Sequence, residues 1–285
     1  MTLSESRFII FGSNGFVGNA VALSLEKKGA VTIRVSRQEH DFQSKSLWRG
    51  IDQLNENDVL VFAVAQAPVR TFQDFQNNID IVDNFIFNFN DKKFRQIVNI
   101  SSDAVYADCL SLISEESRVG PTALHGCMHL VRELALNKSF GESVLHVRPT
   151  LIFGPGDPHG GYGPNKFLKD ARSIGIITLY GQGEELRDHI FIDDVGEIVA
   201  KAVADGVTGI INAVTGNAVS FLQIAENIVQ LFENVKIQFI SRSNPPPHLG
   251  VRRFSNRRLS ELLPDFTFTS VEKGINLMNY QIEGR

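Results

Sequence analysis

The sequence is poor in cysteine and has no long apolar run. Its two cysteines, Cys109 and Cys127, are too few for the disulfide framework of a small secreted domain. An uninterrupted apolar stretch of about 18 residues, which a membrane-spanning helix would need, does not occur. The first residues lead into an expected strand without the charged and apolar segments of a signal peptide. We therefore expect a cytoplasmic protein that does not bind membranes.

An excess of basic charge is also missing. The 285 residues include 28 Lys and Arg against 32 Asp and Glu, a formal net charge of -4, and the pI is near 6.0. This balance creates no positive field for nucleic acid, so we expect no nucleic-acid partner. A hydrophobic content of 43% is enough for a substantial core. The final Ile-Glu-Gly-Arg at 282–285 matches a protease recognition sequence used in engineered fusions, and we leave it out of the fold prediction.

Short apolar runs alternate with helical patterns through the first half of the chain. This rhythm predicts an α/β fold with a doubly wound parallel sheet of the Rossmann type. We expect a dinucleotide-binding region over 1–150 and a smaller substrate-binding lobe over 151–281 that is interleaved with the Rossmann core. The expected strands lie at 8–11, 31–35, 59–64, 96–100 and 144–147, and the expected helices include 20–28 and 130–137.

A glycine-rich loop follows the first expected strand. Gly12 can adopt backbone angles closed to other residues, Gly15 allows close approach of a pyrophosphate, and Gly18 allows tight packing of helix against strand. The helix that begins here would direct its positive end at the phosphates. Alone, the spacing G-x-x-G-x-x-G is also compatible with a structural turn. The predicted cofactor loop comprises Gly12, Ser13, Asn14, Gly15, Phe16, Val17 and Gly18.

Several further motifs agree in order and spacing with one family. From about Arg7 to about Tyr280 the chain resembles the extended short-chain dehydrogenases/reductases, particularly the epimerases, dehydratases and reductases of nucleotide sugars. The motifs that carry the resemblance are the glycine loop, Asn78-Ile79 with Asn84, Ser101-Ser102 with Val105-Tyr106, Arg148-Pro149 with Gly154-Pro155-Gly156, Gly181-Gln182-Gly183, Arg187-Asp188 and Asp193-Asp194-Val195.

The resemblance implies a nicotinamide dinucleotide as cofactor. The second strand ends in Ser36 and Arg37, a hydroxyl beside a guanidinium, which favours the 2'-phosphate of NADP, with NAD as the alternative. Asp41 and Phe42 resemble the turn that contacts the adenine. The remaining implied cofactor contacts are Ala63, Val64, Ala65, Asn78, Ile100, Arg148 and Pro149.

The resemblance also implies a nucleotide-sugar substrate and, as is common in the family, a homodimer. Arg187 is the leading candidate for the substrate diphosphate because a guanidinium donates two hydrogen bonds while staying charged. The alternative is that it pairs with Asp188 or Asp193. Other implied substrate contacts are Ser102, Asp103 and Asn165. Arginines at 252, 253, 257 and 258 are expected to form a solvated basic face.

The catalytic segment departs from the family pattern. The resemblance implies a Ser or Thr, a Tyr and a Lys; Ser102 matches the first, while His125 and His129 stand at the Tyr and Lys positions. These histidines are one helical turn apart and share a face. An imidazole can act as general acid and base near neutral pH, which predicts an enzyme with His125 in the tyrosine's role and His129 hydrogen-bonding the ribose.

This segment also allows two other interpretations. The site could have lost catalysis and serve a regulatory or structural protein that binds dinucleotide or nucleotide sugar. A zinc site is disfavoured because no Glu follows the first His, so we predict no metal. The absence of a Glu after Asp103 argues against a standard 4,6-dehydratase. Weaker candidates for substrate or proton contacts are Tyr106, His159, Tyr162 and His189, the last expected to be a packing residue.

Overall fold

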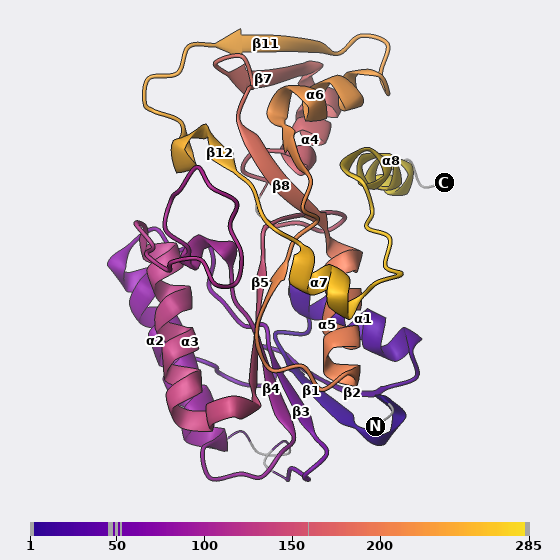
Figure 1. The fold of residues 1–285 in the computed structure, drawn as a ribbon. Coiled ribbons are helices and arrows are strands. Elements are labelled where there is room, and N and C mark those ends of the chain that lie inside the picture. The colour runs from indigo at the N-terminus through magenta and orange to yellow at the C-terminus, as the bar shows by residue number, and fades with distance from the viewer. Residues whose placement is uncertain (1–2, 45–47, 49–50, 52, 159, 283–285) are drawn as a thin grey trace. The chain divides into compact units, whose positions relative to one another are not determined.

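The computed structural model describes residues 3–44, 48, 51, 53–158 and 160–282. These residues form two compact units, shown in Figure 1. The first unit comprises Met1–Ala107, Arg118–Pro149 and Val195–Ala213. The second comprises Asp108–Ser117, Thr150–Asp194 and Val214–Arg285. The sequence predicted a substrate-binding lobe over 151–281 interleaved with the Rossmann core; in the structure the chain passes between the units at several points.

A six-stranded parallel sheet forms the centre of the first unit, in the order β2-β1-β3-β4-β5-β9. The predicted doubly wound α/β fold is thereby confirmed. β1 pairs with β2 on one side and with β3 on the other, so the strand order changes direction at β1. Ligands of doubly wound sheets bind at such a switch point. The strands are β1 (Arg7–Phe11), β2 (Val31–Val35), β3 (Val59–Phe62), β4 (Gln96–Ile100), β5 (Val144–Pro149) and β9 (Gly209–Ala213).

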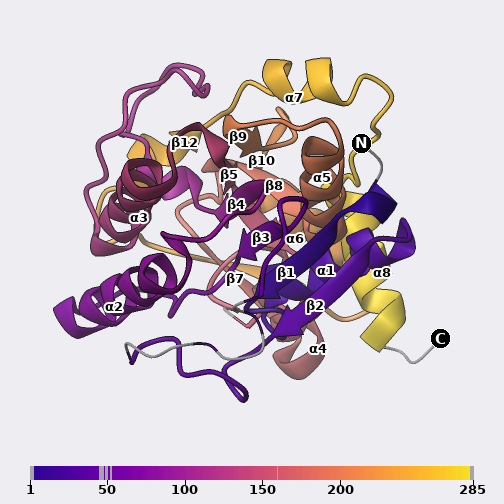
Figure 2. The same ribbon diagram turned by 90° about the horizontal axis from the view of Figure 1, so that it is seen from below.

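Helices cover both faces of this sheet, as Figure 2 shows, with α2 and α3 on one face and α1 and α5 on the other. The α2/α3 face holds an aromatic core in which Phe11 and Phe62 of the sheet meet Phe85 and Phe89 of α2 and the single tryptophan, Trp48. The helices are α1 (Phe16–Lys27), α2 (Phe72–Phe89), α3 (Leu124–Phe140) and α5 (Ile192–Ala204), with short 3-10 turns η1 (Leu3–Glu5), η2 (Asp103–Val105) and η3 (Gly141–Ser143).

The local sequence explains these elements. Strands β3 and β4 are buried at every position, as expected where both faces of a parallel sheet are covered. A capping box between Thr71 and Asp74 begins α2. Helices α1 and α3 start four and six residues earlier than the apolar periodicity predicted, because their first turns carry glycine and histidine in place of core residues.

The second unit combines small sheets with three packed helices. β8 pairs with β10, β12 and β6, and β7 pairs with β11. Its core gathers Phe153, Phe167, Phe191 and Phe221. The elements are β6 (Leu151–Phe153), α4 (Pro164–Ile174), β7 (Ile176–Tyr180), β8 (Leu186–Phe191), β10 (Ala218–Ser220), α6 (Phe221–Val229), β11 (Lys236–Ile240), η4 (Pro247–Gly250), β12 (Val251–Arg252), α7 (Arg257–Leu262) and α8 (Val271–Ile282).

Candidate functional site

The glycine loop follows β1 at the switch point of the sheet. A Cβ on Gly12, whose φ is +85°, would lie 2.9 Å from the Ala63 carbonyl oxygen, and one on Gly18 would lie 2.2 Å from the Gly12 carbonyl oxygen. Both positions therefore require glycine. Gly15 is the N-cap of α1 and supplies no side-chain acceptor, so the first turn of the helix can direct its N–H groups at an anion. This backbone cradle fits a dinucleotide pyrophosphate.

Residues of the loop differ in how they face solvent. Asn14 is exposed, whereas Ser13 is fully buried and its hydroxyl donates to the Val35 carbonyl. The Ser13 N–H also donates to the Val35 carbonyl, so both donors of this residue hold the loop against β2. Phe16 and Val17, the first two residues of α1, are half-buried.

The end of β2 carries a feature that the sequence reasoning missed. Ser36 is buried, and both its N–H and its hydroxyl donate to Glu39 Oε2, at 3.0 and 3.1 Å. Arg37 is exposed. The Ser36 hydroxyl, one of the two groups that were predicted to hold a 2'-phosphate, is therefore occupied by a carboxylate of the same chain. Nothing in the strand-end pattern indicated Glu39, because it folds back from three residues further on.

The loops after β2 and β3 are fixed by two buried asparagines of α2. Asn84 Nδ2 donates to the carbonyls of Asp41 and Ser44, at 3.2 and 2.6 Å, and so holds the predicted adenine turn. Asp41 is exposed and caps that turn, while Phe42 is buried. Asn78 bonds both backbone groups of Gln66, at 2.9 and 3.0 Å, and fixes the segment after β3 that contains Ala63, Val64 and Ala65.

Ser102 and the start of α3 lie together at the end of β4. Ser102 Oγ accepts the Ala104 N–H at 3.1 Å and so caps η2, which contains half-buried Asp103. A Cβ on Gly126 would lie 2.1 Å from the Ala104 carbonyl oxygen, so α3 packs directly on η2. His125 precedes this glycine. The predicted serine and histidine therefore belong to neighbouring segments held together by a glycine contact.

His125 and His129 pack against each other. Their ring centroids are 4.8 Å apart with an interplanar angle of 83°, as expected for one face of one helix. His129 is 5% exposed. Burial, the Arg132 guanidinium and the His125 ring together hold the pKa of His129 well below its usual value, so this ring is neutral at physiological pH. His129 cannot supply the positive charge of a lysine.

A buried ion pair lies behind the pair of histidines. Arg148 Nε and Nη2 donate to Glu133 at 2.9 and 2.6 Å, and the Arg148 guanidinium lies 4.8 Å from the Tyr106 ring centre. Burial would raise the pKa of Glu133, but hydrogen bonds and charge from Arg148, with the Ser101 hydroxyl, outweigh burial and hold it below the usual range. Predicted as a cofactor contact, Arg148 has its side chain engaged in this network, and Pro149 is buried.

Tyr106 belongs to the same network. It is 2% exposed, and its hydroxyl donates to Asn212 Oδ1 of β9 at 2.7 Å. This contact ties the segment after β4 to the edge of the sheet. The tyrosine therefore has a structural contact of its own, and we place it below His125 as a proton donor.

Arg187 of β8 is buried in the second unit. Its Nη2 donates to Glu185 Oε2 at 2.6 Å and to the Pro247 carbonyl at 2.7 Å, so Glu185 is an ion-pair partner of Arg187. Arg242, which the sequence reasoning missed, pairs with the other oxygen of Glu185. Two guanidinium groups therefore share one carboxylate. Asp188 instead caps the turn at Thr215 and Gly216.

The other predicted residues of the second unit are also located. Asn165 of α4 bonds both backbone groups of Gly154, at 3.1 and 2.7 Å. His189 is 2% exposed and packs on Phe221, and burial lowers its pKa to about 4, which supports its expected packing role. Tyr162 is half-buried against Phe221. His159 lies outside the described residues.

The expected basic face is smaller than predicted. Arg253, Arg257 and Arg258 are exposed, but Arg252 is 3% exposed and pairs with Asp108 at 3.2 Å. The prediction was wrong for Arg252 because its place on β12, beside β8, buries the side chain. A sequence of neighbouring arginines does not reveal which of them a short strand will turn inward.

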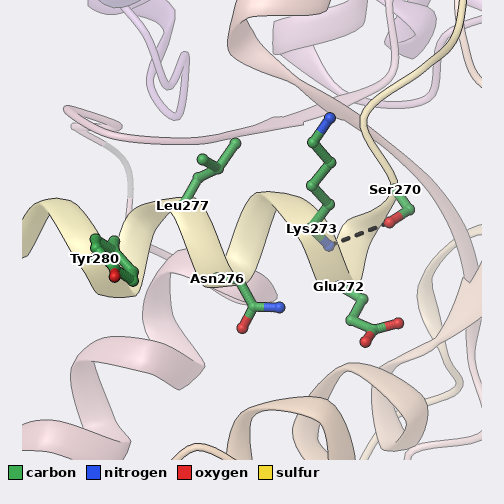
Figure 3. Close-up of a pocket in the computed structure, with 6 residues that line it drawn as sticks. All are labelled: Ser270, Glu272, Lys273, Asn276, Leu277 and Tyr280. Atoms are coloured by element: carbon green, nitrogen blue, oxygen red, sulfur yellow. Dashed lines mark hydrogen bonds between the residues drawn. The ribbon is translucent and has the colours of Figure 1, made fainter.

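A surface hollow on α8 contains none of these predicted residues (Figure 3). It carries one acidic and one basic side chain, and the Ser270 hydroxyl accepts the Lys273 N–H at 3.1 Å. Its lining is Ser270, Glu272, Lys273, Asn276, Leu277 and Tyr280. In the described part of the chain, no group of three or more His, Cys, Asp or Glu residues is placed to hold a metal ion. No helix among the described residues is long and apolar enough to cross a membrane.

The sequence of this chain is similar to those of enzymes that act on nucleotide sugars. GDP-L-fucose synthase of Dictyostelium discoideum is 22% identical over 96% of this chain and 94% of its own. UDP-glucose 4-epimerase of Mycolicibacterium smegmatis is 30% identical, over 31% of this chain and 30% of its own.

Solved structures with the same fold include two ligand-bound proteins. UDP-glucuronic acid 4-epimerase of Bacillus cereus, in complex with UDP-glucuronic acid and NAD, has a TM-score of 0.79 at 18% identity over 98% of this chain and 99% of that chain. The GDP-L-fucose synthetase of Naegleria fowleri, bound to NADP, has a TM-score of 0.80 at 16% identity over 100% of this chain and 96% of that chain. The model of the NAD dependent epimerase/dehydratase family matches residues 8–213, and the chain belongs to that family.

Proposed function

We propose that this protein is an NAD(P)-dependent oxidoreductase or epimerase that acts on a nucleotide sugar by hydride transfer with His125 in the place of the tyrosine. The observation that carries the proposal is the pair of segments at the end of β4. Ser102 caps η2, and Gly126 brings the start of α3, with His125, against that same turn. A hydroxyl and an imidazole on packed neighbouring segments are suited to handling one substrate hydroxyl.

The chemistry follows from these two side chains. The nicotinamide, when bound, accepts a hydride from a sugar carbon or returns one to it. His125 in its neutral form takes the proton from the hydroxyl on that carbon, and as imidazolium gives it back when the carbonyl is reduced. Ser102 Oγ accepts the Ala104 N–H, and this bond does not consume its own hydrogen, which can be donated to the substrate oxygen.

A nucleotide sugar is supported as the substrate by the enzymes that this chain resembles. Their names include a UDP-glucose 4-epimerase and a GDP-L-fucose synthase, which differ in nucleotide, sugar and reaction. We propose Arg187 as the diphosphate ligand. For this, the guanidinium must exchange its Glu185 partner for phosphate oxygens, and the second guanidinium, Arg242, would retain Glu185.

Proton NMR of UDP-, GDP-, dTDP- and CDP-sugars incubated with the protein and NAD or NADP tests the proposal. New sugar resonances are expected from one of these mixtures. His125→Ala should lower the rate by roughly a hundredfold or more, as expected on removal of a general acid and base. Lys138→Ala, an exposed change on the same helix, should leave the rate unchanged. Ligand line-broadening without turnover in the unsubstituted protein would instead indicate a binding protein without catalysis.

We also propose a homodimer in which α3 contacts its copy. Leu124, Val131 and Leu134 are 36%, 39% and 61% exposed and share one face of the helix. An exposed apolar stripe of this kind is typical of a protein interface. Light scattering after gel filtration should give a dimer mass, and Leu134→Glu should give a monomer. Leu23→Glu, at a leucine on α1 that is 53% exposed, should leave the dimer intact.

A reducing compartment such as the cytoplasm is proposed on the state of the cysteines. Cys109 and Cys127 are both free thiols. Free and partly accessible thiols persist where glutathione and thioredoxin keep them reduced. Fractionation of cells that express the protein, followed by thiol labelling without prior reduction, should find both cysteines labelled and the protein in the cytoplasmic fraction.

A further inference from the structure

Arg132 lies buried behind the histidine pair and belongs to no motif that the sequence revealed. It is 2% exposed, on α3, three residues after His129. Its Nη1 donates to the Val64 carbonyl at 2.9 Å, and its Nη2 donates to the Ile100 carbonyl. Nη2 also lies 3.0 Å from His129 Nδ1. The guanidinium therefore joins the ends of β3 and β4 to the second histidine of the site.

The chemistry of the two groups determines where the His129 proton lies. A guanidinium only donates hydrogen bonds, so His129 Nδ1 must accept, and the single proton of the neutral ring must be on Nε2. Protonation of Nδ1 would direct an N–H at a guanidinium inside the protein, with two positive charges in contact. Burial lowers the pKa of Arg132 to about 10, which still leaves it charged at neutral pH.

We infer that Arg132 is a positioning residue that fixes His129 as a neutral ring with its proton on Nε2. It also places a permanent positive charge next to the two histidines, His125 and His129. The catalytic part of this inference rests on the proposed function. The family resemblance implies a lysine, and with it a positive charge, at the position of His129. In this chain the charge is on Arg132, on the next turn of α3, and His129 Nε2 becomes a hydrogen-bond donor of fixed direction.

The tautomer of His129 can be measured without any turnover. Ring nitrogen NMR of the full chain, with His129→Gln to assign the signals, is expected to show a neutral His129 with the proton on Nε2 from pH 8 to pH 5.5. His125 and Arg132 are the titratable groups that lower its pKa. In Arg132→Met the same ring should stay neutral through burial but populate both tautomers, whereas Arg132→Lys, which can still donate to Nδ1, should keep the proton on Nε2. A proton on Nδ1, or an unchanged ring in Arg132→Met, would overturn the inference.

Arg132→Met alone could be unstable because it loses the hydrogen bonds to Val64 and Ile100. A second test therefore moves the positive charge from position 132 to position 129. His129→Lys places an ammonium beside the guanidinium and should lower the urea midpoint of unfolding. Combining it with Arg132→Met removes the repulsion, so the double variant should lose less free energy of unfolding than the sum of the two single losses. Strictly additive losses would refute a charge at this position.

Failure of this inference and failure of the proposed function are separable. If His129 has the predicted tautomer but the protein turns over no sugar, the inference is supported and the proposed catalytic function is refuted. If turnover depends on His125 but the His129 proton is on Nδ1, the proposed catalytic function is supported and the inference about Arg132 is refuted. In an active enzyme, Arg132→Lys should retain more of kcat than Arg132→Met at equal stability, because the lysine keeps the charge.

Discussion

At the scale of single residues, the choice of cofactor depends on Glu39. Its carboxylate accepts both the N–H and the hydroxyl of Ser36, two donors that a 2'-phosphate could otherwise use. Glu39 is itself exposed, so it can leave when NADP binds, but NADP must displace it and NAD need not. The prediction of NADP from Ser36 and Arg37 thus carries a cost that the strand-end pattern did not show.

Glu39→Ala should therefore strengthen NADP binding. Two donors would lose their internal acceptor and one negative charge would be removed, so the NADP dissociation constant should fall by about tenfold, equivalent to about 1.4 kcal/mol. The NAD dissociation constant should stay within about twofold. Titration of both cofactors by calorimetry gives the ratio, with Gln38→Ala as the exposed neighbouring control. Parallel changes for NAD and NADP would show that Glu39 does not discriminate between them.

Residue-scale prediction succeeded where a motif fixes both spacing and chemistry. Gly12 and Gly18 lie where their motif predicts and require glycine for a steric reason that the structure displays. Glu39 was not predicted because it folds back onto Ser36. Arg132 was not predicted because it is buried beside His129 and outside every motif. A side chain that serves the site from behind has no sequence spacing of its own.

At the scale of elements, the contact between α3 and η2 decides whether the serine and histidine can act together. Gly126 is the only residue type that fits, since a Cβ would lie 2.1 Å from the Ala104 carbonyl oxygen. The sequence predicted the helix but not this contact. Helical periodicity reports which face is buried, whereas the distance of approach to a neighbouring turn depends on the tertiary fold.

Gly126→Ala should separate these two elements. Backbone atoms must move to admit the methyl group, so we expect a loss of about 1–3 kcal/mol in the free energy of unfolding. Turnover should fall more steeply, because a displacement of about 1 Å can cost on the order of a hundredfold in rate. Urea denaturation and the sugar NMR assay measure the two effects. Gly29→Ala, with φ of +78° and open space around the Cβ, should lose stability but keep its activity.

At the scale of the whole molecule, the predicted Rossmann core was found, but the sequence did not indicate at which residues the chain passes between the two units. The repeated strand and helix pattern of the first half follows local physics that a sequence displays directly. The segments Asp108–Ser117 and Val195–Ala213 are assigned to their units by contacts with residues distant in sequence. Patterns of local hydrophobicity hold no information on such long-range pairing.

The stability of the first unit should depend on buried neutral histidines. Burial, with the charges of Arg148 and Arg132, lowers the pKa of His146 to about 4 against an opposing effect of Glu133, and that of His129 is lowered as well. Because the unfolded chain binds protons near pH 6.5 and the folded unit does not, this stability is complete above pH 6.5 and is lost toward pH 4. His146 alone accounts for about 3 kcal/mol across that window.

The single tryptophan, Trp48, lies in the core of the first unit and reports its unfolding by fluorescence. Urea titrations from pH 7.5 to pH 4.5 should show a free energy of unfolding that falls with pH, and His146→Gln should have a shallower slope. Stopping at pH 4.5 leaves out the protonation of Glu133, whose lowered pKa places its own loss of stability below that pH. Equal slopes for His146→Gln and the unsubstituted protein would mean that His146 binds a proton as readily in the folded unit as in the unfolded chain. The polar network around Glu133 and Arg148 would then not depend on a neutral His146 ring.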